Sequence, residues 1–236
     1  MFLSEKMKKT TVQITVVSDV VCPWCYIGKR RLEKAIRESA PTYDFDIAYA
    51  PFELNPHMPG EGADQKEYLT RKFGSAQRYD QITQHVTQVA AEEGLTFDFE
   101  RQRVAPNTRD AHRIITYAKT VGRQPEVKEA FLKAYFTEGV DLSKHVNLVK
   151  VAVAAGLDQK AVEEILHTDA FSVEVEQEQR ANHQRGISGV PFYIINGKYG
   201  VSGAQPAEVF LEIFAEINKP LAMAQGDACD VETGEC

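Results

Sequence analysis

Two cysteines separated by two residues are the part of this sequence whose residue types most directly indicate chemistry. Cys22 and Cys25 enclose Pro23 and Trp24. A thiolate at the first position can attack a disulfide, and a thiol about one helical turn further along can then resolve the mixed disulfide. The spacing therefore predicts a redox-active dithiol in which Cys22 attacks and Cys25 resolves, while Pro23 and Trp24 bias its reduction potential.

The residues around this pair predict a strand followed by a helix. Thr11–Ser18 alternates in polarity and is rich in β-branched residues, which is typical of a strand in a buried sheet. Gly28–Ser39 carries apolar residues at helical spacing, and Pro23 suits the first turn of a helix because its missing N–H is not needed there. Cys22 would then lie where free N–H groups and the positive end of the helix dipole stabilise a thiolate.

Two structural interpretations compete with the redox interpretation of this pair. The thiols could be small apolar side chains buried in a helix. They could also form half of a zinc site with Cys229 and Cys236. Zinc sites with four cysteines usually draw on two short-spaced pairs, and the second pair here is spaced more widely. The histidines show no metal-ligand spacing either, so we expect no metal site.

The remaining strand and helix patterns complete a small sheet. A second strand is expected at Phe45–Ala50, and strand patterns return at Pro191–Ile195 and Lys198–Val201. The last two flank Asn196-Gly197, a strong signal for a hairpin turn, and a helix is expected at Pro206–Asn218. Together with the first strand and helix, these elements predict an α/β protein with a thioredoxin-like fold and a central mixed sheet.

The middle of the chain has a different pattern. Between about residues 62 and 185 the sequence indicates successive helices separated by breaks that contain glycine or proline. We therefore predict a discontinuous thioredoxin-like domain over residues 12–61 and 186–218, interrupted by a large inserted all-helical domain at residues 62–185. Residues 219–236 predict a flexible, acidic C-terminal tail that carries the second cysteine pair.

The composition is that of an ordinary globular protein. Of the 236 residues, 43% are hydrophobic and 26% are charged, so a sizeable core can form without disulfide cross-links. The net charge of −7 argues against nucleic acid or an anionic membrane as a partner. The apolar run Val12–Val17 is too short for the core of a signal peptide. We expect a cytoplasmic protein, in which catalytic cysteines are more common than structural disulfides.

Val190 and Pro191 form the second informative element. Pro191 opens a strand after a loop, far downstream of the cysteine pair. Thioredoxin-like proteins carry a cis-proline at this place, in a loop that packs against the two sulfurs. We therefore expect a cis bond and a Val190 backbone that faces a bound peptide. The alternative is an ordinary trans proline at a strand edge.

The second cysteine pair, Cys229 and Cys236, has two interpretations. Acidic neighbours disfavour thiolates at both positions, so neither is expected to attack first. The pair could be an auxiliary redox pair that exchanges with the first one, because a short flexible loop can close into a disulfide. It could equally be two idle thiols in a frayed tail.

Three polar residues also have alternative interpretations. Asp19, three positions before Cys22, could accept the proton of Cys25 or simply end a strand. Asn107 could cap a helix or bind a ligand, and the cap is favoured. His112 could face the cleft and tune Cys22, although a single histidine in a helix is more often structural.

Five segments of the chain together resemble one known family. They are Ser18–Gly28, Phe52–Pro56, Asn107–Arg113, Gly186–Phe192 and Gly200–Gln205. Their order and residues are similar to those of the FrnE-like branch of the DsbA family of thiol–disulfide oxidoreductases, over about residues 12–217. The resemblance implies a thioredoxin fold interrupted by a helical domain, dithiol–disulfide exchange and no bound cofactor. By position it implies that Cys22 attacks, Cys25 resolves and Pro191 is the cis-proline.

A neighbouring branch with the same architecture contains 2-hydroxychromene-2-carboxylate isomerase and kappa-class glutathione transferase. Those enzymes use glutathione and carry a serine near the position of Cys22, so the presence of both cysteines favours redox exchange. We expect a thiol–disulfide oxidoreductase or protein disulfide isomerase acting on protein or peptide thiols and disulfides, as a monomer or homodimer, with glutathione as a candidate co-substrate. The alternatives are a glutathione-dependent isomerase or transferase and a redox-gated chaperone.

Overall fold

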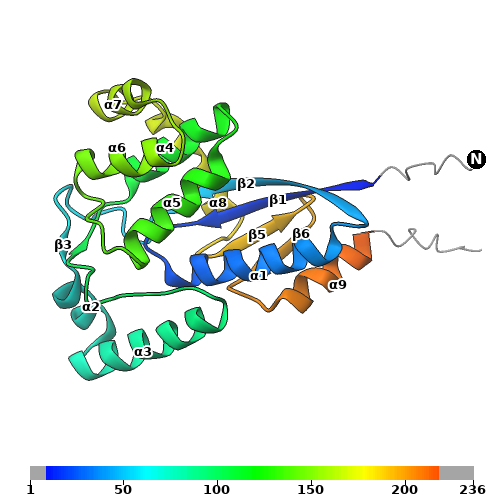
Figure 1. Ribbon diagram of the computed structural model, residues 1–236, viewed down its shortest axis with the longest axis horizontal. Helices are drawn as coiled ribbons and strands as arrows, with labels where there is room; N and C mark the ends of the chain where they lie inside the picture. Colours follow the sequence, from blue (N-terminus) through cyan, green and yellow to red (C-terminus); the bar gives the residue numbers. More distant parts are fainter. Residues whose placement is uncertain (1–8, 218–236) are drawn as a thin grey trace, which may run out of the picture.

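A four-stranded mixed sheet forms the centre of one end of the molecule (Figure 1). The computed structural model describes residues 9–217. β1 (Thr10–Ser18) lies parallel to β2 (Tyr43–Pro51) and antiparallel to β5 (Phe192–Ile195), and β6 (Tyr199–Ser202) pairs with β5 in the antiparallel direction. The strand order β2-β1-β5-β6 places β1, which leads into the cysteine pair, inside the sheet. The predicted α/β class with a central mixed sheet is confirmed.

The hairpin between β5 and β6 turns at the residues that the sequence indicated. Asn196 and Gly197 both have positive φ, of 51° and 65°. A two-residue hairpin turn of this kind matches the twist of the strands that it joins. The turn is also fixed to β1, because the backbone N–H of Gln13 donates to Asn196 Oδ1 at 2.8 Å.

Two helices lie side by side against one face of the sheet (Figure 1). They are α1 (Pro23–Ser39) and α9 (Ala207–Ile217). At Gly28 the helix comes so close to β5 that a Cβ atom would lie 2.2 Å from the Tyr193 hydroxyl. Glycine at this position therefore allows α1 to pack closely on the sheet.

Seven helices lie between β2 and β5 in the chain. In Figure 1, α2 lies to the left of α1, α3 lies at the lower left, and α4 to α7 lie at the upper left. α8 contacts β2 and helps to cover the face of the sheet opposite α1. The helices are α2 (Gln65–Phe73), α3 (Ala76–Glu92), α4 (Arg109–Thr120), α5 (Gln124–Phe136), α6 (His145–Ala154), α7 (Gln159–His167) and α8 (Ser172–Gln184).

The segment at residues 62–185 is not entirely helical, and in this detail the prediction was wrong. β3 (Ala63–Asp64) and β4 (Val104–Ala105) form a two-residue antiparallel ladder. The chain entering α2 and the chain leading toward α4 run beside each other here, so their backbone groups can pair. A pair this short leaves no alternating pattern in the sequence.

One hydrophobic cluster contains residues of both the sheet and the helices between β2 and β5. Ile14 and Phe210 belong to it, as do Phe131 and Phe136 of α5. α5 also completes the backbone pairing of β2, because the Gln124 side chain accepts from the N–H of Tyr49 at 2.8 Å and donates to its carbonyl at 2.9 Å. The helical segment is therefore packed on the sheet through both apolar and polar contacts.

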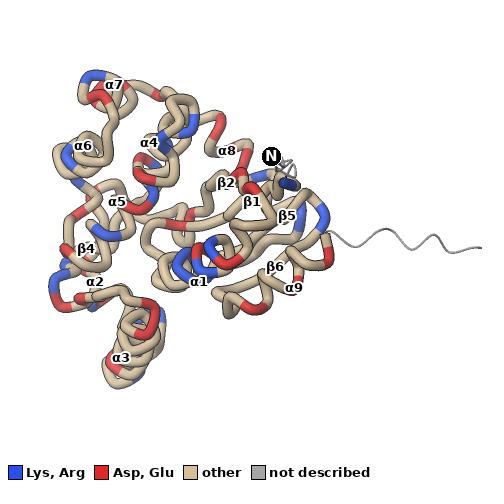
Figure 2. The backbone as a smooth tube through the Cα atoms, turned by 45° about the vertical axis from the view of Figure 1, so that its right-hand side comes forward, with Lys and Arg blue, Asp and Glu red and all other residues tan. Residues whose placement is uncertain are grey.

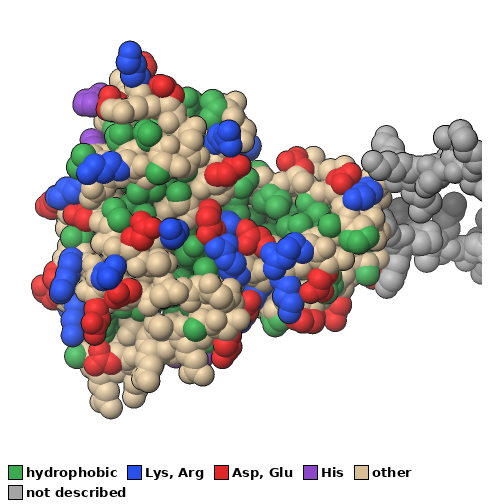
Figure 3. Space-filling view, in the orientation of Figure 1, with side chains coloured by type: hydrophobic (Ala, Val, Ile, Leu, Met, Phe, Trp, Pro, Cys, Tyr) green, Lys and Arg blue, Asp and Glu red, His purple; other side chains and the backbone are tan. Residues whose placement is uncertain are grey.

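Charged residues of both signs are spread over the described surface. Figure 2 shows several basic residues close together on α1, and the face in Figure 3 shows acidic and basic side chains interspersed. Of the helices within residues 9–217, none has both the length and the apolar character needed to cross a membrane.

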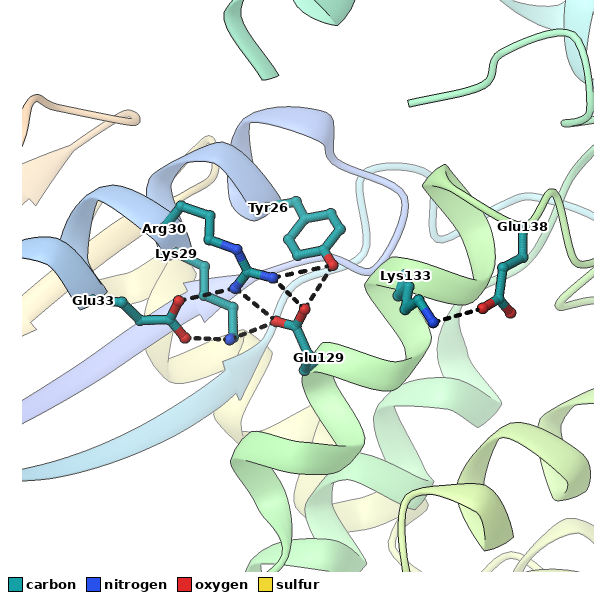
Figure 4. Close-up of polar contacts among 7 residues, drawn as sticks. All are labelled: Tyr26, Lys29, Arg30, Glu33, Glu129, Lys133 and Glu138. Atoms are coloured by element: carbon teal, nitrogen blue, oxygen red, sulfur yellow. Dashed lines mark hydrogen bonds and ion pairs between the residues drawn. The ribbon is translucent and has the colours of Figure 1, made fainter. Parts of the chain in front are cut away.

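A network of ion pairs connects α1 to α5 (Figure 4). Glu129 of α5 accepts a hydrogen bond from the Tyr26 hydroxyl at 2.6 Å and lies 2.6 Å from the Lys29 ammonium. Both oxygens of Glu129 also pair with the Arg30 guanidinium. Glu33 closes the network on α1, where it binds both Lys29 and Arg30.

The network holds Glu129 in its ionised form. Burial alone would favour the neutral acid, but the hydrogen bond from Arg30 and the charge of Lys29 lower the pKa of Glu129 to about 2. Since this value lies below the ordinary one, the network stabilises the fold fully above about pH 4.5 and loses that contribution as the pH falls toward 2.

Glu129→Gln should lower the free energy of unfolding by about 2 kcal/mol at neutral pH, between the values typical of exposed and buried ion pairs. The difference from wild type should shrink near pH 3, because the unfolded wild type takes up a proton on Glu129 there while the folded protein, in which the pKa is about 2, does not. Urea unfolding of both proteins at the two pH values measures this.

Glu126→Gln on the same helix is a suitable control. Glu126 is 52% exposed and lies 3.9 Å from Arg123, so its loss should change stability little at either pH. An equal loss of stability at both pH values in Glu129→Gln would contradict the role of the ionised carboxylate.

Candidate functional site

Cys22 lies at the junction between β1 and α1. It is the N-cap residue of the helix, with extended backbone (φ −94°, ψ 112°), and Pro23 begins the first turn. Its side chain makes no capping hydrogen bond, so the sulfur lies near the unpaired N–H groups and the positive end of the helix dipole. Both Cys22 and Cys25 are nearly buried, with 4% and 3% of their surface exposed. The structure thus places Cys22 at the start of α1, where the sequence predicted the attacking sulfur.

The loop before β5 packs directly on Cys22. The Val190–Pro191 peptide bond is cis, and the Cys22 thiol donates to the Val190 carbonyl at 3.5 Å. Trp24 lies beside them, with its ring centroid 6.2 Å from that of His85 on α3. The structure therefore brings Val190, which is far away in the sequence, together with Cys22 and Trp24.

The second cysteine pair lies outside the residues that the structure describes. The auxiliary redox role of Cys229 and Cys236, and the zinc site that would include them, therefore stay predictions. Within residues 9–217, no group of three or more histidine, cysteine or acidic side chains is arranged to hold a metal ion.

Asp19 forms a buried cluster behind the cysteines. Its carboxylate is fully buried, accepts from the N–H groups of Val20 at 2.7 Å and Leu54 at 2.8 Å, and lies 3.2 Å from His112 Nε2. Burial opposes ionisation, but the hydrogen bond and charge of His112 outweigh it and lower the pKa of Asp19. A carboxylate of this kind is a weak base. The geometry therefore favours a structural role for Asp19 over that of proton acceptor for Cys25.

His112 and Asn107 both make structural contacts. His112 is 2% exposed and points to Asp19, so it supports the site from behind. Asn107 Oδ1 accepts from the N–H of Arg109 at 2.9 Å, and Asn107 Nδ2 donates to the Met58 carbonyl at 2.7 Å. Asn107 thus satisfies a donor at the start of α4 as expected of a cap, although the N-cap position itself is taken by Thr108.

Lys128 is a buried residue that the sequence did not reveal. It is 1% exposed, and its ammonium lies 6.0 Å from the centroid of the Tyr49 ring. Burial lowers the pKa of Lys128, and negative charge on Cys25 and Asp19 opposes that shift. Lysines on amphipathic helices are almost always exposed, so only the packing of α5 could identify this one.

The environment of Cys25 separates the two thiols chemically. Burial raises the pKa of Cys25 well above its ordinary value, and the hydrogen bond with Cys22 and the charge on Cys22 raise it further. The charge of Lys128 acts in the opposite direction. Burial and the neighbouring sulfur therefore keep Cys25 protonated.

A cavity of about 320 Å³ opens beside Cys22. It lies between the amino-terminal end of α1, the Val190 loop and the helices α2, α3 and α5. A larger groove of about 840 Å³ lies between the opposite face of the sheet and α8, and it contains neither cysteine. The smaller cavity is the one that can bring a substrate to the sulfur.

The fold and the site together define the class of thiol–disulfide oxidoreductases with a thioredoxin fold. The chain matches the model of the DSBA-like thioredoxin domain over residues 13–215, and it belongs to that family. The prediction of the DsbA family from sequence motifs is thus confirmed. The FrnE-like branch stays a resemblance.

Known proteins are similar along nearly the whole chain. A probable DsbA oxidoreductase from Streptomyces coelicolor is 33% identical, with a TM-score of 0.82 over 94% of this chain and 97% of that one. The uncharacterized protein YwbO of Bacillus subtilis (strain 168) is 28% identical over 211 residues, which are 89% of this chain and 98% of YwbO. The cytosolic disulfide reductase DsbM of Pseudomonas aeruginosa, solved with GSH, is 15% identical with a TM-score of 0.60, over 86% of this chain and 99% of DsbM, and shows likeness of fold.

Lys128→Met should raise the pKa of Cys25, because it removes the buried cation that favours the Cys25 thiolate. Resolution of a mixed disulfide on Cys22 should then slow about three- to tenfold at neutral pH, and its pH profile should move to higher pH. Rapid-mixing experiments that start from the mixed disulfide measure this rate.

Lys133→Met is the matched control on the same helix. Lys133 is 58% exposed and pairs with Glu138 at 3.0 Å (Figure 4), and its charge is not among those that shift the pKa of Cys25. It should leave the rate and the pH profile unchanged. If Lys128→Met also left the profile unchanged, its charge would have no part in resolution.

Proposed function

We propose that this protein catalyses thiol–disulfide exchange through Cys22 and Cys25, as an oxidoreductase or disulfide isomerase without a bound cofactor. The observation that carries the proposal is the position of Cys22, which is at the positive end of α1, against the Val190 carbonyl and at the wall of a cavity. Its substrates are thiols and disulfides of proteins, peptides or small molecules, with glutathione as a candidate co-substrate. We place the reaction in a reducing compartment such as the cytoplasm, where catalytic cysteines are more common than structural disulfides.

The reaction in the reducing direction has two exchange steps. The Cys22 thiolate attacks one sulfur of the substrate disulfide, forms a mixed disulfide and releases the first substrate thiolate. Cys25 then loses its proton and attacks the Cys22 sulfur, which forms the Cys22–Cys25 disulfide and releases the second thiolate. Two electrons pass from the protein to the substrate, and the reverse sequence oxidises a substrate dithiol.

The charges around the site order these steps. While Cys22 is a thiolate, its charge and hydrogen bond keep Cys25 protonated. Formation of the mixed disulfide removes the charge on Cys22, but the cation of Lys128 remains beside Cys25. Ionisation of Cys25 therefore becomes easier only when a mixed disulfide is present to be resolved.

The presence of a resolving thiol favours exchange over the alternatives. A glutathione-dependent isomerase or transferase needs a single nucleophile or activating group at the position of Cys22. Here the N–H of Cys25 donates to the Cys22 carbonyl at 3.0 Å in the first turn of α1, which places the second thiol close to the first and suits disulfide formation between the two.

Equilibration in glutathione redox buffers should reveal a reversible two-electron transition that needs both Cys22 and Cys25. Cys22→Ser should abolish it, because the attacking sulfur is gone. Cys25→Ser should instead accumulate a mixed disulfide with glutathione, because nothing resolves it. Trp24 fluorescence and mass-resolved thiol trapping measure the transition and the adduct.

The Cys229→Ser/Cys236→Ser variant separates the two cysteine pairs. A transition that persists with a shifted midpoint would assign an auxiliary redox role to the second pair, and an unchanged midpoint would make that pair independent. A transition of wild-type size in Cys22→Ser would overturn the proposed function.

A further inference from the structure

Three polar side chains form a hydrogen-bonded row in the wall of the cavity beside Cys22. The Tyr135 hydroxyl donates to Gln65 Oε1 at 2.9 Å, and Gln65 Nε2 donates to Gln102 Oε1 at 2.9 Å. All three residues line the cavity and are at most 4% exposed. Burial raises the pKa of Tyr135, so its hydroxyl keeps its proton and acts as a donor. The row therefore fixes which end of each amide is donor and which is acceptor.

The last donor of this row is unpaired. Gln102 Nε2 has no hydrogen-bond partner among the residues that the structure describes, although it is buried. Leaving a buried N–H unpaired costs free energy, and buried polar groups in native proteins are nearly always satisfied. An acceptor on a bound molecule would satisfy it.

The other walls of the cavity are mainly apolar. Leu69 and Phe73 of α2, Ile82 of α3 and Phe99 contribute to them. Among the described residues that line the cavity, Lys72 is the only charged one, and it is exposed. A neutral, apolar molecule with one acceptor suits this lining. A tripeptide such as glutathione, with two carboxylates and an ammonium, would lose more hydration than the lining restores.

The depth of the sulfur limits the size of the substrate. Cys22 is 4% exposed, so a disulfide must enter the cavity to meet it. The volume of about 320 Å³ is at the small end of the roughly 300–1,000 Å³ that is typical of small-molecule sites. A compact molecule fits this geometry better than a folded protein chain does.

We propose that the preferred substrates of this site are low-molecular-weight disulfides with an apolar, aromatic-sized body and a hydrogen-bond acceptor that meets Gln102 Nε2. The inference rests on the proposed function. Reduced protein transfers two electrons to such a disulfide, the substrate S–S bond breaks, two small thiols leave and the Cys22–Cys25 disulfide forms. The bound half of the substrate lies among α2, α3 and Phe99 while its sulfur faces Cys22.

Binding can be tested apart from the chemistry. In a variant with all four cysteines changed to serine, 4,4′-dithiodipyridine cannot react, and Trp24, the single tryptophan, lines the cavity and reports occupancy by fluorescence. Dithiodipyridine carries a ring nitrogen as acceptor, and diphenyl disulfide has the same shape without it. We expect saturable quenching by both, with dithiodipyridine bound about tenfold more tightly, and glutathione disulfide bound at least tenfold more weakly than dithiodipyridine.

Two further substitutions in that background test the contacts. Gln102→Met removes the amide but keeps a side chain of similar length. It should abolish the difference in affinity between dithiodipyridine and diphenyl disulfide. Phe73→Ala, at a half-buried wall position, should weaken both ligands about fivefold without threatening the core. Val146 on α6 is 59% exposed and lies outside the cavity, so Val146→Ala should change the affinity of neither ligand.

The outcomes separate this inference from the proposed function. Absence of saturable quenching, an unchanged preference in Gln102→Met, or glutathione disulfide bound as tightly as dithiodipyridine would each overturn the substrate class. The redox transition of the wild-type protein in glutathione buffers would be unaffected by such results. Conversely, ligand binding in the cysteine-free protein would persist even if the wild type showed no redox transition.

Discussion

The packing of α5 against α1 and β2 is the contact on which the site depends. Glu129 holds the amino-terminal half of α1 through its ion pairs with Lys29 and Arg30. One residue earlier, Lys128 places a cation behind the cysteines, and Gln124 pairs with the backbone of β2. One helix therefore fixes the position of the attacking thiol and also sets the electrostatics of the resolving thiol.

Position on α1 is what distinguishes two chemically identical thiols. Cys22 and Cys25 are both nearly inaccessible, but only Cys22 lies at the end of the helix and at the wall of the cavity. Cys25 is within the helix, where desolvation and the neighbouring sulfur keep it protonated. The contact with His112 lowers the pKa of Asp19, which favours a structural role for this carboxylate over that of a base toward Cys25.

The helices between β2 and β5 contribute more than a cover for the sheet. α4 supplies His112 and α5 supplies Lys128 to the buried cluster, while α2 and α3 supply walls of the cavity. The redox pair lies at the end of a sheet strand, and the substrate selectivity that we infer comes from the helices between β2 and β5. A sheet with the same cysteines but other helices would present the same chemistry to different substrates.

The sequence by itself determined the dithiol, the order of strands and helices around it, the Asn196–Gly197 turn and the DsbA family, because each depends on residues that are close in the chain or on motifs in fixed order. It missed the β3–β4 ladder, the burial of Lys128, the unpaired Gln102 amide and the ion-pair network of Glu129. A lysine or glutamine on a helix looks the same in sequence whether it faces water or another helix. Only the packing of distant segments decides its solvation, and solvation decides both its charge and its chemistry.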